Sequence, residues 1–276
     1  MDNNRTPKIS IIISTYNSEE WLEKVLWSYN TQLFKDFEII IADDGSKQPT
    51  FDLIAKMIPL VNYNIIHVWH EDNGFQKSQI LNKAILACNA DYILMSDGDC
   101  IVRNDFIETH MKYRERGYFL SGGYFMLPMS ISKLISKEDI INQYCFDLCW
   151  LKKNGLKRSF KNFKLTSKGR FERILNYLTP TNASWNGHNS SGWKNDILAV
   201  NGFDERMQYG GQDRELGERL FNKGIKSKQI RYSAICLHLD HPRGYKTKDS
   251  IDKNLAIRAV TKKEKKTWTD FGIKKV

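Results

Sequence analysis

The sequence predicts an α/β protein with a mixed, mainly parallel sheet flanked by helices. Four apolar runs, each long enough for a buried strand, follow one another within the N-terminal part of the chain. Segments with helical spacing of apolar residues separate these runs, and each run ends in Asp, Asn, Ser or Gly. Strands that alternate with helices through short loops are typical of parallel sheets with right-handed crossovers.

The first two units lie close to the N-terminus. PKISIIISTYN predicts a buried strand and a loop, and SEEWLEKVLWSYNTQ follows with Trp21, Leu22 and Val25 at helical spacing. FEIIIADDGS repeats the strand and the polar turn, and DLIAKMI returns as a helix. The chain therefore begins with two strand and helix units.

Two more units follow. NYNIIHVWHEDNG predicts a third strand and loop, QKSQILNKAILACN a helix, and DYILMSDGDC a fourth strand that ends in carboxylates. In open sheets of this kind, ligands bind beyond the carboxyl ends of the strands. The polar residues expected at that edge are Ser14, Tyr16, Asn17, Asp43, Asp44, Asp72, Asn73, Asp97 and Asp99.

The pattern loosens after Asp99. NDFIETHMKYRERG predicts a helix, GYFLSGGYFML predicts one strand, and the basic residues 152–173 are expected to be helical. LTPTNASWNGHNSSGWKND is rich in Asn, Ser and Gly and predicts a loop, after which a helix begins near Gln212. Regular alternation of strands and helices is thus confined to the first part of the chain.

Two segments, with net charges of +8 and +7, account for more than the formal net charge of +10, and the rest of the chain is acidic. Residues 152–173 hold nine Lys/Arg and one Glu, and residues 243–276 hold eleven Lys/Arg and four acids. Basic residues concentrated in two segments favour docking to an anionic surface, such as lipid headgroups or phosphates. A solvated basic face is the alternative.

Composition and length describe a globular chain. With 276 residues and 41% hydrophobic content, it can bury one sizeable core. No run approaches the roughly 20 apolar residues that cross a bilayer, and MDNNRTPKIS lacks the apolar core of a signal peptide. The five cysteines are scattered without the paired spacing of a zinc site, which predicts buried, reduced thiols. These features predict a cytoplasmic protein.

The tripeptide formed by Asp97, Gly98 and Asp99 is the strongest sign of chemistry. Two carboxylates on either side of one small residue can together face a divalent cation and its phosphate ligands. Mg²⁺ and Mn²⁺ prefer such oxygen donors. Similar short strings serve ordinary turns, so it is the position after the fourth apolar run that favours a metal site here.

STYN, ADDGS, DNGFQKSQILNKAI and SDGDC together resemble family 2 glycosyltransferases, which have the Rossmann-like GT-A fold. The resemblance implies a UDP-sugar donor and Mn²⁺ or Mg²⁺, with Asp99 as the principal metal ligand. It also implies that Ser14, Tyr16 and Asp44 contact the uracil and ribose. Asp97 would lie against the ribose and the metal. The predicted nucleotide site comprises Ser14, Tyr16, Asp44, Asp72, Lys77 and Asp97.

A second resemblance lies in the C-terminal half. VNGFDERMQYGGQDRELGERL is similar to the acceptor segment of galactosyltransferase-type enzymes, in which a glycine pair precedes two acidic residues. Here Gln212 replaces the first acid, which alters the acceptor contacts expected of it, and Asp213 keeps the second. The resemblance makes Asp213 the general base that takes the proton from an acceptor hydroxyl. A helix-capping Asp213 paired with a neighbouring arginine is the alternative.

CLHLDHPRG supplies two histidines after a short apolar stretch. By the same resemblance, a histidine at this place completes the metal site; His238 is the better match and His241 the alternative. His67 and His70 straddle the end of the third predicted strand, with no further donors expected nearby. We interpret that second pair as structural.

Several assignments have plain alternatives. Trp185 and Asn189 are candidates for the acceptor or sugar pocket because aromatic side chains in loops stack on sugar faces, but they could equally pack the loop itself. Asp43 and Asp44 could form an acidic pair at the start of a helix.

The sequence thus predicts one GT-A domain: a nucleotide-sugar-binding half (residues 1–101), an acceptor-binding and catalytic half (102–245) and a basic tail (246–276). By resemblance, it transfers a hexose, with galactose and N-acetylhexosamines as candidates, from a UDP-sugar to a hydroxyl of a glycan or lipid-linked acceptor, with inversion. The expected pathway is surface polysaccharide or lipopolysaccharide synthesis, and the expected place the inner face of a membrane.

Two other functions fit the sequence less well. A nucleotidyltransferase acting on a sugar phosphate would need a glycine-rich basic loop after the first strand, and STYNSEEW has neither glycine nor base. A basic nucleic-acid-binding protein would interleave its cations with a recognition motif, and none is present. We therefore predict no nucleic-acid partner.

Overall fold

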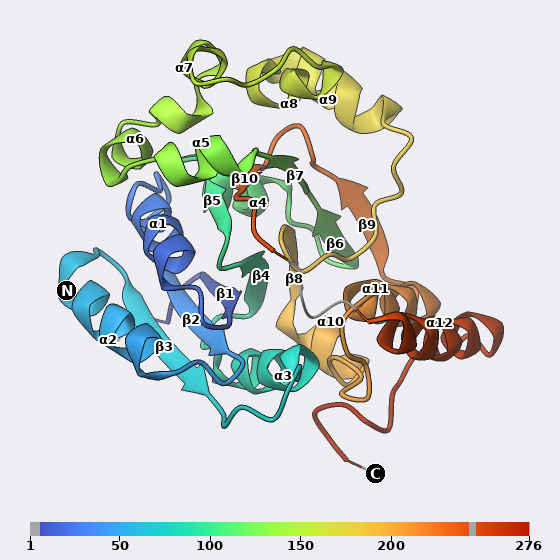
Figure 1. The fold of residues 1–276 in the computed structure, drawn as a ribbon. Coiled ribbons are helices and arrows are strands. Elements are labelled where there is room, and N and C mark those ends of the chain that lie inside the picture. Colours follow the sequence, from blue (N-terminus) through green and yellow to red (C-terminus); the bar gives the residue numbers. More distant parts are fainter. Residues whose placement is uncertain (1–5, 243–246, 276) are drawn as a thin grey trace.

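The computed structural model describes residues 6–242 and 247–275, and its centre is a seven-stranded sheet in the order β3-β2-β1-β4-β8-β6-β9 (Figure 1). Strands β1 to β4 are parallel, β8 runs antiparallel to β4 and β6, and β9 is parallel to β6. The strands are β1 (Ile9–Thr15), β2 (Phe37–Asp43), β3 (Asn64–Trp69), β4 (Tyr92–Asp97), β6 (Tyr118–Ser121), β8 (Ser190–Trp193) and β9 (Lys226–Gln229). The predicted mixed, mainly parallel sheet is confirmed.

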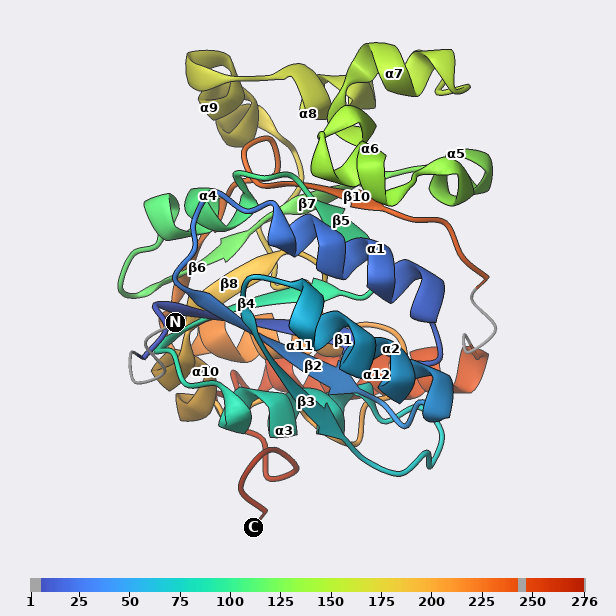
Figure 2. The ribbon, with the colours of Figure 1, turned by 90° about the vertical axis from the view of Figure 1, so that its left-hand side faces the viewer.

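Helices cover both faces of this sheet (Figure 2). On one face, Ile9, Ile11 and Ile13 of β1 pack in the same core as α1 and α2, and on the other Ile12 packs with α3, α10 and α11. This alternation follows from the two-residue period of a strand. The helices are α1 (Glu19–Asn30), α2 (Gln48–Met57), α3 (Lys77–Ala87), α4 (Phe106–Tyr113), α10 (Lys194–Ala199) and α11 (Gln212–Asn222), with the 3₁₀ turn η1 (Ile58–Leu60).

A second, three-stranded sheet has the order β5-β10-β7. Its strands are β5 (Cys100–Val102), β7 (Gly123–Met126) and β10 (Ile235–His238). The predicted single strand GYFLSGGYFML is therefore wrong, because β6 and β7 belong to different sheets. The break falls at Gly122, where an added Cβ would lie 2.2 Å from the side chain of Asn189. The predicted boundary after residue 101 falls inside β5.

The predicted basic helical segment consists of several short pieces. The insert (residues 148–178) contains α7 (Leu148–Lys153), η3 (Phe160–Asn162), α8 (Phe163–Thr166) and α9 (Gly169–Leu178). It follows α5 (Met129–Leu134), α6 (Lys137–Ile141) and η2 (Tyr144–Phe146). Both ribbon views place the insert at the rim, away from the large sheet (Figures 1 and 2).

The predicted basic tail is a folded part of the domain from residue 247 onward. It forms α12 (Lys248–Lys263), which packs beside α11. Arg258 pairs with Glu218 at 2.6 Å, and Thr261 Oγ1 donates to Glu215 Oε1 at 2.9 Å. The described part of the predicted tail is therefore packed on the domain. Residues 246 and 276 of the predicted tail, residues 243–245 before it, and residues 1–5 of the N-terminal segment lie outside the described residues.

All five cysteines are free thiols, and four are buried as predicted; Cys149 is exposed. Within residues 6–242 and 247–275, no helix has both the length and the apolar character needed to cross a bilayer.

Candidate active site

The carboxyl ends of β1 and β4 bring the first predicted site residues together. These strands are parallel neighbours, and their register sets Ser14 opposite Asp97. Ser14 Oγ donates to Asp97 Oδ1 at 2.7 Å, and Lys77 Nζ, from the start of α3, lies 2.7 Å from the same oxygen. Gly98 lets the chain turn closely over β1, since an added Cβ there would lie 2.9 Å from Ser14 O.

The Lys77 and Asp97 pair is ionised. Burial works against both charges, but the pKa of Lys77 is raised by Asp97 and Asp213, and the pKa of Asp97 is held well below its usual range, chiefly by Lys77. An ammonium and a carboxylate that keep each other charged at a strand end are suited to holding a polar, anionic ligand.

The loops after β1, β2 and β3 bring the next group together. Tyr16 OH donates to Asp72 Oδ2 at 2.9 Å, and Asp44 lies 2.8 Å from His70 Nε2 and accepts from the backbone N–H of Gln76 at 3.1 Å. Gly45 has a φ of +94°, and an added Cβ would lie 2.5 Å from the Asp72 backbone. Only glycine fits that approach, so the turn sets the position of Asp72.

The two histidines interpreted as structural do have carboxylate partners, contrary to the expected isolation. His67 Nε2 lies 2.9 Å from Asp43 Oδ2, and His70 Nε2 lies 2.8 Å from Asp44 Oδ1. These contacts fix both carboxylates of the ADDGS turn. Asp43 is completely buried and also accepts from the Ser46 backbone N–H, so only Asp44 retains a partly open position.

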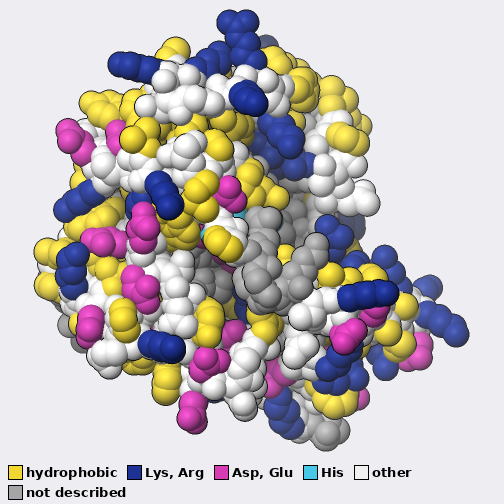
Figure 3. All heavy atoms as spheres, in the orientation of Figure 1, with side chains coloured by type: hydrophobic (Ala, Val, Ile, Leu, Met, Phe, Trp, Pro, Cys, Tyr) yellow, Lys and Arg dark blue, Asp and Glu magenta, His cyan; other side chains and the backbone are white. Residues whose placement is uncertain are grey.

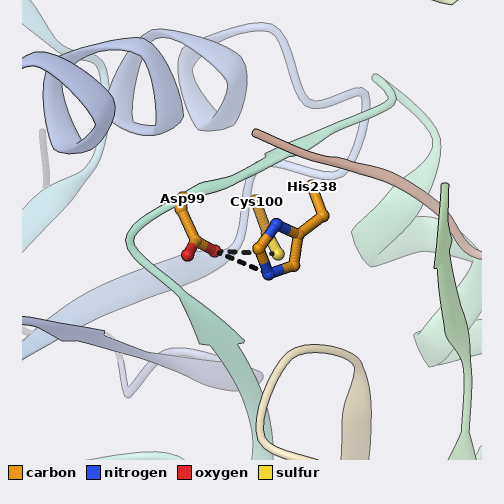
Figure 4. A group of neighbouring side chains, drawn as sticks. All are labelled: Asp99, Cys100 and His238. Carbon is orange, nitrogen blue, oxygen red and sulfur yellow. Dashed lines mark hydrogen bonds and ion pairs between the residues drawn. The ribbon is translucent and has the colours of Figure 1, made fainter. Parts of the chain in front are cut away.

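Asp99, Cys100 and His238 form a group of neighbouring ligand atoms, all within 4.8 Å of one another (Figure 4). The antiparallel pairing of β5 with β10 sets Cys100 opposite His238. Asp99 Oδ1 lies 3.7 Å from His238 Nε2, and Asp99 Oδ2 lies 3.0 Å from His241 Nε2. The structure brings both histidines to Asp99, with their rings stacked at 5.5 Å.

The donor set of this group fits Mn²⁺ or Mg²⁺. A hydrogen bond to Cys236 and burial raise the pKa of the Cys100 thiol well above its ordinary value, so it stays protonated and leaves a carboxylate and imidazole as ligands. Oxygen-rich sites with open positions for phosphate oxygens suit these ions, whereas thiolates would select softer metals.

His188 is a site residue that the sequence analysis missed. It lies in the loop before β8, and burial lowers the pKa of His188 to about 4, although Asp97 opposes the change. The ring of Tyr124 contacts two histidine rings: its centroid lies 4.8 Å from that of His188 and 5.1 Å from that of His238. A usable signal was present: His188 stands between Trp185 and Asn189, two residues that were assigned to the pocket.

Asp213 lies in the first turn of α11, after a glycine pair with φ of +110° and +93°. Burial and the nearby Asp97 raise the pKa of Asp213 to about 6, while Lys77 opposes the change. Its Oδ1 is buried and, among the described residues, has no hydrogen-bond partner. Gly187 leaves room for it, because an added Cβ would lie 3.1 Å from Oδ1.

The alternative roles around Asp213 find less support. Within the part of the chain that the structure describes, Asp213 forms no ion pair with an arginine, so the capping-and-pairing alternative lacks its partner. Glu215, two residues further along α11, is 1% exposed and paired with Arg219 at 2.7 Å. Gln212 accepts from the backbone N–H of Gly210 at 3.1 Å and supports the glycine turn.

Trp185 and Asn189, predicted to line the acceptor or sugar pocket, lie in the interior, and Trp185 is among the residues that line the cavity. Both are 0% exposed. The Trp185 ring packs 5.5 Å from that of Phe119. The amide of Asn189 donates to Gly123 O and Ala234 O and contacts His110 Nε2. They shape the wall of the site from behind, by packing and by satisfying buried polar groups.

A cavity of about 1380 Å³ opens at Asp213, and the predicted nucleotide and metal residues, such as Lys77, Asp97 and Asp99, are not among its lining residues. Asp213 and His188 line it, as does Tyr124, and the insert forms its opposite wall. Figure 3 shows a hollow in the centre of this face, with Lys and Arg side chains gathered along its upper rim. A cavity of this size exceeds the usual range for one small ligand, about 300–1,000 Å³, and leaves space for two substrates.

The comparisons with known proteins agree with this geometry. Residues 10–136 match the family model described as "Glycosyl transferase family 2". These residues form a family 2 glycosyltransferase domain. The glycosyltransferase is 26% identical over 285 residues to the uncharacterized glycosyltransferase YfnE of Bacillus subtilis, covering 90% of this chain and 69% of the relative. It is 24% identical over 270 residues to chondroitin synthase of Escherichia coli, covering 92% of this chain but only 38% of that synthase.

Solved structures share the GT-A fold of this glycosyltransferase. S. aureus TarS 1-349 in complex with UDP-GlcNAc has a TM-score of 0.59 at 15% identity, covering 94% of this chain and 69% of that one. The mannosyltransferase PcManGT from Pyrobaculum calidifontis, in complex with GDP-Man and Mn²⁺, has a TM-score of 0.56 at 14% identity, covering 88% and 60%. The galactosyltransferase-type resemblance of residues 200–220 stays a prediction.

Proposed function

We propose that this glycosyltransferase uses a divalent metal to transfer a hexose, with galactose and N-acetylhexosamines as candidates, from a UDP-sugar to a hydroxyl of a glycan or lipid-linked acceptor. One observation carries the proposal: the Asp213 carboxylate, whose Oδ1 has no hydrogen-bond partner among the described residues, lines the large cavity and lies close enough to Lys77 and Asp97 to affect their charges. A base beside a donor site is the arrangement that glycosyl transfer to a hydroxyl requires.

The donor side of the proposal uses the carboxyl ends of β1, β2 and β4. Tyr16, Asp72 and Asp44 offer a ring and carboxylates to the base and ribose, and Ser14 and Lys77 orient Asp97 toward the ribose. Asp99, with His238 or His241, would hold Mn²⁺ or Mg²⁺, which when bound neutralises the charge that develops on the departing UDP. His188 adds an uncharged imidazole to the same wall.

The acceptor side uses Asp213. The acceptor oxygen forms a bond to the anomeric carbon, the bond from that carbon to the UDP oxygen breaks, and the hydroxyl proton moves to Asp213. A single displacement of this kind inverts the anomeric centre. We propose surface polysaccharide or lipopolysaccharide synthesis as the process. Chondroitin synthases and the GalNAc(5)-diNAcBac-PP-undecaprenol beta-1,3-glucosyltransferase of Campylobacter jejuni are among the relatives.

A thermal-shift panel tests the proposed function. UDP and UDP-hexoses at about 100 times Kd should raise the Tm by roughly 5–10 °C in the presence of Mn²⁺, because a ligand that binds only the native state stabilises it. GDP-mannose and CMP-sugars serve as matched controls. If no nucleotide-sugar shifts the Tm with either Mn²⁺ or Mg²⁺, the proposal is contradicted.

We also propose that the enzyme works at the cytoplasmic face of a membrane, docked through the insert. Glu172 and Asn176 hold one face of α9 on the domain, since Ser233 Oγ donates to Glu172 and Asn176 Nδ2 donates to Ser233 Oγ, both at 2.8 Å. The other face presents Phe171 and Ile174, which are 48% and 51% exposed. Tyr177, Leu178 and Phe160 are more exposed still, at 88%, 65% and 70%.

Vesicle co-sedimentation tests this docking. Each cation near an anionic surface adds about 1 kcal/mol, so replacement of Lys168, Arg170 and Arg173 by Gln should weaken binding to anionic vesicles by about 100-fold. High salt should have the same effect, and neutral vesicles should not bind. Replacement of Lys8, Lys35 and Lys56 by Gln, three exposed lysines outside both basic segments, removes the same charge and is the matched control. Equal binding to anionic and neutral vesicles at low salt would overturn the docking proposal.

A further inference from the structure

A group of cations on the cavity wall has no role in the chemistry described so far. Lys161 and Lys164 of the insert and Arg231, from the loop before β10, all line the cavity that contains Asp213. Within the described residues, none of the three forms an ion pair. We refer to Lys161, Lys164 and Arg231 as the cation cluster.

The cation cluster is held on the back of strand β7. Lys164 Nζ donates to the backbone oxygen of Tyr124 at 2.7 Å. The ring of that same tyrosine contacts His188 and His238, so one residue separates the ammonium from the predicted metal site. Lys164 is therefore fixed on the strand residue whose ring contacts His238, a predicted metal ligand.

Arg231 is also fixed, and part of its hydrogen-bonding capacity is unused. Its side chain lies against Gly123, where an added Cβ would be 3.1 Å from Arg231 Cβ, and Nη1 donates to Thr179 Oγ1 at 3.3 Å. Its Nε is buried without a hydrogen-bond partner in the part of the chain that the structure describes. A buried, unpaired donor on a cation is costly, and an anionic acceptor oxygen would satisfy it.

The electrostatics of the cluster agree with this geometry. Burial, together with the neighbouring Arg231 and Lys161, lowers the pKa of Lys164 to about 8. Like charges gathered without a counter-ion repel one another, and a bound anion would relieve this repulsion. Two or three cations around one position match a phosphate or diphosphate better than a single carboxylate, because those groups carry more charge and more acceptor oxygens.

We propose that the cation cluster binds a phosphate or diphosphate group of the acceptor and so makes this enzyme specific for phosphate-bearing acceptors. The inference rests on the proposed function, because it assigns the substrate class of the same cavity. The phosphate could belong to a lipid-linked diphosphate or to a phosphate on a glycan, and the two share the chemistry that the cluster recognises.

Binding of inorganic pyrophosphate tests the cluster without any need for activity. The titration is done calorimetrically with the donor site already filled by UDP and Mn²⁺. Lys164→Gln and Arg231→Gln should each weaken pyrophosphate binding by about tenfold or more, as expected for loss of a charge-assisted hydrogen bond. Lys161→Gln, an exposed position that should fold normally, should weaken it less. Lys153→Gln, an exposed lysine of α7 that does not line the cavity, should leave the affinity unchanged.

Transfer assays then distinguish the acceptors. Four acceptors that present the same sugar are compared: a short-chain alkyl diphosphate, a sugar phosphate, a uronic acid conjugate and a neutral alkyl glycoside. In Lys164→Gln and Arg231→Gln, the KM for phosphate-bearing acceptors should rise about tenfold with little change in kcat. The KM for the neutral acceptor should not change. The diphosphate and phosphate arms identify which source binds better.

Several outcomes would overturn the inference. These are a uronic acid conjugate that is preferred to both phosphates, equal losses for neutral and phosphate-bearing acceptors, or pyrophosphate affinity that is the same in parent and variants. Weaker UDP binding in the cluster variants would assign the cations to the donor instead. Failure of the proposed function looks different, since the parent enzyme would then neither bind UDP with Mn²⁺ nor hydrolyse a UDP-sugar.

Discussion

Asp99→Ala is expected to abolish metal-dependent binding of UDP while leaving the fold intact. The Asp99 carboxylate faces His238 and His241, 17% of the side chain is exposed, and its contact with the core is a long hydrogen bond accepted from Cys100 Sγ at 3.4 Å. Loss of outer-shell partners of a metal costs 10–100-fold in affinity, so loss of the principal ligand should weaken Mn²⁺-dependent UDP binding by at least about 100-fold. Calorimetric titration of UDP with and without Mn²⁺ measures this effect.

The matched control is Asp52→Ala, an exposed carboxylate on α2, which should bind UDP and Mn²⁺ as the parent does. His238→Gln and His241→Gln, titrated in the same way, decide which imidazole completes the site, because only the ligand's replacement should weaken Mn²⁺ binding. Parental UDP and Mn²⁺ affinity in Asp99→Ala would show that the metal assignment is wrong.

Asp213→Asn is expected to keep donor binding and lose transfer. The substitution preserves the size of the side chain and removes the proton acceptor. General base catalysis contributes about 10²–10⁴-fold to the rate, so kcat should fall by that factor. The Kd for UDP should stay within about twofold of the parental value. Steady-state rates at saturating donor measure the loss. Near-parental turnover in this variant would assign the base elsewhere.

The pH profile gives a second measurement of the same assignment. A base works only when it is ionised, and burial with the nearby Asp97 raises the pKa of Asp213 to about 6. The parental rate should therefore rise with pH up to about 6 and then level off. The residual activity of Asp213→Asn should not show this rise of the rate with pH. Asp196→Asn, at the start of neighbouring α10, should keep both the rate and its rise with pH.

The parallel half of the fold could be predicted because its signals are local. Each of the first four strands is a run of Ile, Val and Leu followed at once by polar residues, and a parallel sheet places those ends along one edge. The contact between Ser14 and Asp97 follows from that register alone. The small sheet could not be predicted, since strands of three or four residues that pair over long distances leave no periodicity in the sequence.

The loop around Trp185 shows another limit of composition. Asn, Ser and Gly predicted an exposed loop, yet Asn189 is buried because its amide satisfies two carbonyls and a histidine that come from distant parts of the chain. Composition reports how polar a segment is and not whether its polar groups find partners inside. His188 was passed over for the same reason, although it lines the cavity.

The small sheet also has a consequence for the order in which the protein is assembled. β5 and β7 do not pair with each other; each pairs only with β10, which begins at Ile235. During synthesis both strands must wait until most of the chain has been made, and joining them closes long loops at an entropic cost. Asp99 precedes β5 and His238 ends β10, so a ribosome-bound or truncated chain can hold strands β1 to β4 and still lack His238, one of the proposed metal ligands.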